Sequence, residues 1–149
     1  MQVIVSDDAA GLGEALILRT LEAYPRDRVA VLDGGNRFNP YALARDAQER
    51  GQPPRELLSR VLVSRAFTCF QMDALVARPL PAPRAVVLSM LDLFLEDEVA
   101  FSTAQLLLRR AAASLARMDA VCVEWRPTSW RAERLLEILA AHAAELQSA

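Results

Sequence analysis

The chain has 149 residues, of which 53% are hydrophobic and 24% are charged, and its formal net charge at pH 7 is −2. This length and composition predict one globular domain spanning residues 1–149 and exclude a disordered chain. The negative net charge argues against strong direct binding to nucleic acid, which depends on an excess of basic side chains.

The apolar runs are too short to cross a bilayer, so we expect no membrane partner. The first residues reach Asp7 and Asp8 without the basic and apolar regions of a signal peptide, which favours a cytoplasmic protein. Cys69 and Cys122 lack the spacing of a metal site, and we expect both to be small buried hydrophobic residues.

Short apolar runs alternate with helical patterns along the chain. The predicted strands are Val3–Val5, Arg28–Leu32, Arg60–Val63, Ala85–Leu88 and Ala120–Val123. The predicted helices are Glu14–Ala23, Pro40–Arg50, Phe70–Ala77, Thr103–Arg117 and a last one from Ser129 to about Leu146. Because each strand is apolar on both faces, we expect a three-layer α/β/α fold with a mostly parallel sheet of about five strands.

One stripe of the last helix is predicted to pack on the sheet. Its members are Trp130, Leu135, Ile138, Leu139, His142 and Leu146. His142 is the only histidine, so it cannot form a catalytic pair or a multi-histidine metal site.

The segment after the first strand has the layout of a phosphate-binding loop: a strand, a turn of small residues and a helix. Aligned with G-x-x-x-x-G-K-[ST], it places Asp8 at the first glycine, Gly13 at the second, Glu14 at the lysine and Ala15 at the hydroxyl residue. All 17 basic side chains of the chain are arginine. A triphosphate would therefore meet carboxylates where it needs a cation, and we expect no nucleotide cofactor.

The middle of the chain carries a family resemblance. A strand ending in Asp33 is followed by Asn39-Pro40 and a helix, then by the segment Ser64-Arg65-Ala66-Phe67 with Gln71 soon after. In order and spacing this resembles the ATPase core of the RecA/RadA recombinases, in particular their archaeal and eukaryotic branch. The resemblance covers roughly Val5 to Val123 and implies a RecA-like fold.

The same resemblance implies that the nucleotide chemistry is lost. Gly35 stands where the family has the acidic residue that orients the attacking water, and Ser89 stands where it has an aspartate that helps to hold magnesium. With Glu14 and Ala15, four groups that hydrolysis requires are replaced. The family's DNA-contacting loops are also acidic or short here, at Glu96-Asp97-Glu98 and between Glu124 and Thr128.

Aromatic residues near two helix starts are the candidate interface. Phe101 and Ala104 form the pattern F-x-x-A, by which recombinases of this family and their mediators dock a neighbouring ATPase core. The alternative is a phenylalanine buried at a helix start. Trp125 and Trp130 bracket the loop before the last helix, and they suit a protein contact if exposed.

These patterns favour a non-catalytic RecA-like subunit that binds another protein, either a related ATPase or a second copy in a homodimer. Its placement in DNA repair or recombination is implied only by the resemblance. Two other functions remain open. Carboxylates at strand ends, namely Asp7, Asp8 and Asp33, could hold magnesium for phosphoester hydrolysis, or the same crevice could hold an uncharged or cationic small molecule.

Overall fold

The computed structural model describes residues 1–149 and contains a six-stranded sheet in which every neighbouring pair is parallel. The strands are β1 (Gln2–Ser6), β2 (Val29–Asp33), β3 (Val61–Arg65), β4 (Arg84–Leu88), β5 (Asp119–Trp125) and β6 (Glu145–Ser148). Their order across the sheet is β3-β2-β4-β5-β1-β6. The predicted α/β fold with a parallel sheet is confirmed, with one strand more than expected.

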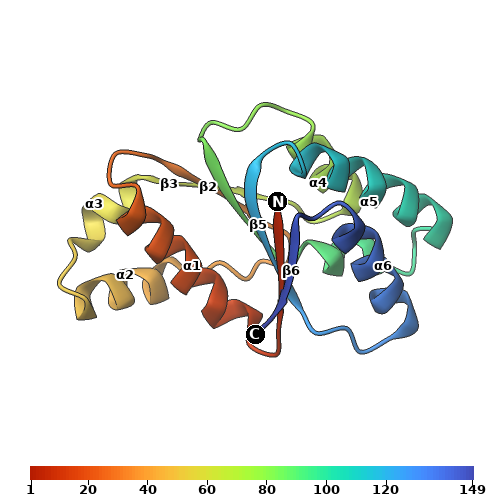
Figure 1. Ribbon diagram of the computed structural model, residues 1–149, viewed down its shortest axis with the longest axis horizontal. Helices are drawn as coiled ribbons and strands as arrows, with labels where there is room; N and C mark the ends of the chain where they lie inside the picture. Colours follow the sequence, from red (N-terminus) through yellow and green to blue (C-terminus); the bar gives the residue numbers. More distant parts are fainter.

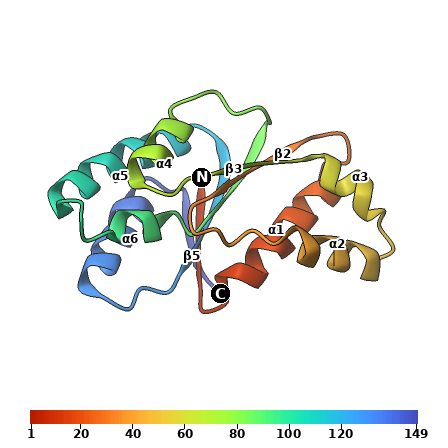
Figure 2. The ribbon, with the colours of Figure 1, turned by 180° about the vertical axis from the view of Figure 1, so that it is seen from behind.

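Helices cover both faces of this sheet and make the three layers visible in Figure 1 and, from behind, in Figure 2. The helices are α1 (Ala9–Ala23), α2 (Pro40–Glu49), α3 (Pro54–Ser59), α4 (Cys69–Val76), the 3-10 helix η1 (Met90–Leu95), α5 (Phe101–Leu115) and α6 (Trp130–Ala141). The first three pack on one face and the other four on the opposite face. From β1 to β3 the chain adds strands toward one edge of the sheet, and after β3 it adds them toward the other edge. Because crossovers between parallel strands are right-handed, the helices change from one face to the other at the same point.

The core consists of two apolar clusters separated by the sheet. The larger contains 25 buried residues and lies under α4, η1, α5 and α6, where Phe94, Leu108 and Leu135 are fully buried. The smaller contains 13 residues under α1, α2 and α3, including Ile17 and Leu43. Burial of each such side chain stabilises the fold by about 1.5–3 kcal/mol, so both helical layers are held to the sheet mainly by apolar packing.

The end of the chain differs from its prediction. The last helix ends at Ala141, with His142 as its C-cap, and the chain then forms β6 beside β1. The Ala144 amide donates to the carbonyl of Met1, and Leu146 pairs with Val3. Pairing with β1 therefore overrides the helical preference of the alanine-rich sequence, and Leu146 is not part of the helix stripe.

Two shorter elements were not expected, namely α3 between α2 and β3 and η1 after β4.

None of the helices is both long enough and apolar enough to cross a lipid bilayer.

Candidate functional site at the carboxyl edge of the sheet

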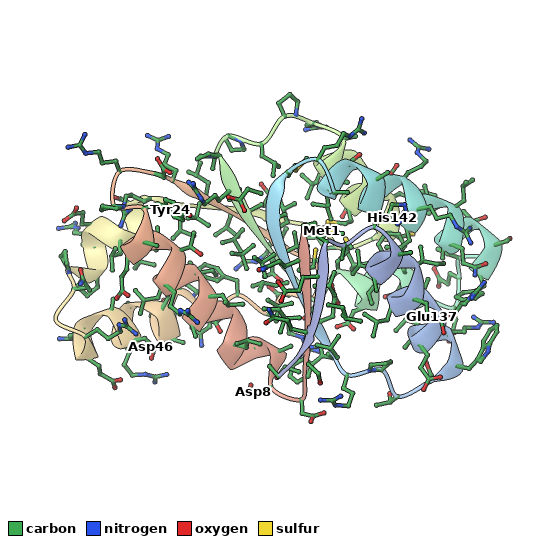
Figure 3. The ribbon with its side chains drawn as sticks, in the orientation of Figure 1. Met1, Asp8, Tyr24, Asp46, Glu137 and His142 are labelled. Atoms are coloured by element: carbon green, nitrogen blue, oxygen red, sulfur yellow. The ribbon has the colours of Figure 1, made fainter.

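The turn after β1 is much tighter than a phosphate-binding loop. Only Asp7 and Asp8 separate β1 from α1, and Asp8 caps the helix by accepting a 3.2 Å hydrogen bond from the Gly11 amide. Figure 3 labels Asp8 at this end of α1 and Tyr24 at the other. The prediction that the helix begins at Glu14 was therefore wrong, because Asp8 is an effective N-cap and Ala9 begins the helix.

Gly13 lies inside α1 instead of in a loop. A Cβ atom there would come within 2.7 Å of Leu88 Cδ2, so the glycine allows α1 to approach β4 closely. Ala15, two residues on, is exposed on the helix surface. Of the residues aligned with a phosphate-binding motif, Gly13, Glu14 and Ala15 thus belong to α1, and Asp8 is its N-cap.

Glu14 points into the protein. Its side chain is buried, and its Oε1 accepts a 2.9 Å hydrogen bond from the amide of Asn39. Asn39 is the N-cap of α2, and its own Oδ1 accepts from the amides of Tyr41 and Ala42. Burial raises the pKa of Glu14, while the hydrogen bond from Asn39 opposes that rise. Glu14 therefore joins α1 to the start of α2.

Asp33, at the end of β2, organises the loop that follows it. The residue is fully buried, and its carboxylate accepts hydrogen bonds from the amides of Gly35, Arg37 and Phe38 at 2.9–3.3 Å. Arg65 Nε of β3 donates to Asp33 Oδ2 at 3.3 Å. Because the carboxylate has these four donors, it has little capacity left for a metal ion.

Ser89 and Glu124 form a second closed arrangement beside this loop. Ser89 is buried with a left-handed backbone, φ 50°, and turns the chain from β4 into η1. Both carboxylate oxygens of Glu124 accept from η1, from the Met90 amide at 2.9 Å and the Leu91 amide at 3.1 Å. Burial raises the pKa of Glu124 to about 8. The free amides at the start of η1 are thus capped by a carboxylate of the chain itself.

A small cleft of about 100 Å³ lies between η1 and the loop after β5. At its side the guanidinium of Arg37 lies 5.4 Å from the ring centroid of Trp125 and 3.8 Å from Asp92. Burial raises the pKa of Asp92, and Arg37 opposes that rise. Pockets for small molecules usually measure about 300–1,000 Å³, so this cleft has room for a few water molecules only.

The carboxylates of the alternative metal site do not converge. Asp7 pairs with Arg126 at 2.9 Å, Asp8 caps α1, and Asp33 is enclosed by its loop. The chain contains no group of three or more His, Cys, Asp or Glu residues arranged to hold a metal ion.

Cys69 and Cys122 are both buried and free, as expected. Figure 3 shows His142 at the end of α6, where its Nδ1 lies 3.0 Å from the carbonyl of Ile138.

The four candidate interface residues differ in exposure: Trp130 is exposed, Phe101 and Trp125 are half-buried, and Ala104 is buried. Trp130 is 70% exposed, and its ring lies 5.6 Å from that of Phe101. Arg131 places its guanidinium 5.3 Å from the Phe101 ring centroid. Ala104 is buried in the core, so the F-x-x-A pattern is not available as a docking anchor. We call Phe101, Trp130 and Arg131 the aromatic cluster.

Trp130 corrects the predicted helix stripe. The buried residues of α6 are Ala132, Leu135, Ile138 and Leu139. Trp130 precedes Leu135 by five residues, which rotates it by about 140° away from this face in a helix with about 3.6 residues per turn. The ring therefore projects from the first residue of α6 instead of packing on the sheet.

No protein-family model matches the chain, and no curated protein matches it.

Proposed function

We propose that this chain is a non-catalytic, RecA-like protein-interaction subunit whose partner acts in DNA repair or recombination. The observation that carries the proposal is the aromatic cluster at the starts of α5 and α6. A tryptophan that is 70% exposed beside a phenylalanine and an arginine has the composition typical of interface hot spots. The repair context rests on the family resemblance alone.

The hydrogen bonds that three buried carboxyl groups make within the protein support a non-catalytic role. Glu14 and Glu124 are buried and accept from backbone amides of distant segments, and Asp33 is buried and accepts from amides of the loop that follows it. Catalysis on a phosphate requires groups that face a substrate and a metal ion. Here the corresponding side chains stabilise loops and helix starts instead.

The surroundings of the aromatic cluster indicate the chemistry of the partner. The exposed acidic residues Glu96, Asp97 and Glu98 directly precede α5, while Arg131 covers one ring of the cluster. Negative charge next to the cluster disfavours a nucleic acid as the ligand. A protein with an apolar pocket for an indole and a basic rim is complementary to this surface.

The test is co-purification of the tagged chain from its source cells, in wild-type form and as Trp130→Ala. We expect a protein that the wild type retains and the variant loses, with binding weakened by about 2 kcal/mol or more in a purified pair. The matched control is Tyr41→Ala, which removes an aromatic side chain that is 84% exposed on α2. A set of captured proteins that does not change with Trp130→Ala would overturn the proposal.

A further inference from the structure

The strand β6 is held to the sheet mainly by backbone hydrogen bonds. It is an edge strand of four residues beside β1, and all four side chains are exposed (Figure 1). None of the four belongs to either apolar cluster. Its side-chain contacts are polar: Gln2 Nε2 donates to Glu145 Oε2 at 2.8 Å, and Arg126 donates to Ser148 Oγ at 3.2 Å. Because segments that bury little apolar area open at low free energy, we expect β6 to open without unfolding the sheet.

No glycine or proline ends α6 before this strand. Many helices end at a left-handed glycine, and proline often follows. Here the C-cap is His142, with φ −97° and ψ −7°, and only Ala143 and Ala144 separate it from β6. The side-chain contact at this end is that of His142 Nδ1, 3.0 Å from the carbonyl of Ile138. Since alanine, glutamate and leucine are strong helix formers, the helix can continue to Leu146 at little conformational cost.

A continued helix would also place an exposed apolar side chain on an apolar face. Leu146 is 53% exposed in β6. In a helix with about 3.6 residues per turn, it would lie within about 20° of both Leu135 and Leu139, because the spacings are close to whole turns. These two leucines are fully buried on the face of α6 that meets the sheet. Placing Leu146 on that face offsets part of the pairing with β1 that is lost.

We propose that residues 142–148 alternate between the strand arrangement and a continuation of α6 to Leu146, and that the helical state opens the edge of β1. The carbonyl of Val5 accepts from the Ala149 amide of the C-terminal segment, whereas the next carbonyl along β1 accepts from the loop after β5. By alternation, Val3 and Val5 point their N–H and C=O groups to β6. These groups lose their partners in the helical state, and an open edge of this kind can pair with an added strand. The segment therefore acts as a movable cover of the β1 edge.

Amide hydrogen exchange of the wild type tests the opening. Ile4 lies between Val3 and Val5, but its amide points to β5. We expect Val3 and Val5 to exchange at least about hundredfold faster than Ile4 and to share the protection factor of Gln147. Equal protection of the three β1 amides would overturn the proposal, because β6 would then open only when the sheet unfolds. Trp130→Ala is expected to leave these rates unchanged, so this proposal and the proposed function fail separately.

Relaxation-dispersion NMR of the wild type tests whether the open state is helical. We expect a minor state, populated at about 0.1–10%, in which the Cα chemical shifts of Ala144 and Leu146 are those of a helix. Shifts of an unfolded chain, or the absence of a minor state, would overturn the proposal.

Two variants are expected to shift the equilibrium in opposite directions. Leu146→Pro removes an N–H that points away from β1, and its ring excludes the helix, so we expect the exchange of Val3 and Val5 to slow at least about tenfold. His142→Ala removes the side-chain contact at the end of α6 and is expected to speed that exchange by a similar factor. Ser148→Pro, beyond the continued helix, is the matched control and is expected to change the rates by less than about threefold. The same rates in Leu146→Pro as in the wild type, or an equal effect of both proline variants, would contradict the helical state.

Discussion

The carboxylate of Glu14 accepts a 2.9 Å hydrogen bond from the backbone amide of Asn39, the residue that caps α2. A side chain that aligns with the lysine of a phosphate-binding motif therefore joins two helices on one face of the sheet. The difference from such a motif is more than the charge of residue 14, because α1 begins at Ala9 and leaves no loop to surround a phosphate.

Introducing the residues of a phosphate-binding motif is expected to damage the protein without creating a nucleotide site. Glu14→Lys combined with Ala15→Ser places a buried ammonium against the Asn39 amide, two groups that both donate hydrogen bonds. We expect the free energy of unfolding to fall by about 1–3 kcal/mol in denaturant titrations. Millimolar ATP with magnesium is expected to leave the melting midpoint of both proteins unchanged. A raised midpoint in either protein would contradict this expectation, and Arg37 would be the first side chain to test.

The pH dependence of stability is expected to report on Glu124. Burial raises its pKa from the usual 4.5 to about 8, so the folded protein holds this proton more tightly than the unfolded chain does. The resulting stability is complete below about pH 4.5 and is lost as the pH rises through about 8. Glu14 and Asp92, whose pKa values are also raised, act in the same direction.

Comparison with Glu124→Gln isolates this contribution. We expect the unfolding free energy of the wild type to fall more steeply between about pH 5 and pH 9 than that of the variant. The measurement is a series of denaturant titrations across that range. Parallel curves for the two proteins would show that Glu124 does not take up a proton in this range.

Asp33→Asn is expected to destabilise the protein, because the amide that replaces one carboxylate oxygen cannot accept from the loop amides. We expect a loss of about 2 kcal/mol or more in unfolding free energy. Asp7→Asn is the matched control, since Asp7 pairs with Arg126 at the surface, and its cost is expected to stay below about 1 kcal/mol. A clear rise of the wild-type melting midpoint with magnesium, absent in Asp33→Asn, would instead favour the metal-site hypothesis.

Gly34→Ala is expected to disturb the contact between the loops after β2 and β4. An added Cβ would lie 2.9 Å from both Met90 Cα and the Ser89 carbonyl oxygen, and neither backbone atom can move freely. We expect a loss of about 1–3 kcal/mol, measured by thermal or chemical unfolding. Gly51→Asn is the control, because Gly51 has φ 70° in open space and asparagine tolerates that conformation. Equal stability of Gly34→Ala and the wild type would mean that the two loops move apart at little cost.

The sequence by itself determined the fold class and most of the strands. The apolar runs around Val31, Val86 and Cys122 are buried on both sides, and such runs have few alternatives to central parallel strands. Local capping residues also set helix starts, as Ser129 does for α6, since an N-cap acts through amides only two or three residues away.

The tertiary structure alone decided the roles of the buried carboxyl groups and the conformation of the end of the chain. Glu124 caps η1 from 34 residues away, and Glu14 reaches Asn39 across 25 residues, distances at which no local pattern signals a contact. Residues 145–148 form β6 because the edge of β1 offers backbone partners, although their local sequence favours a helix. The exposure of Trp130 likewise depends on which face of α6 meets the sheet, and that face is set by packing.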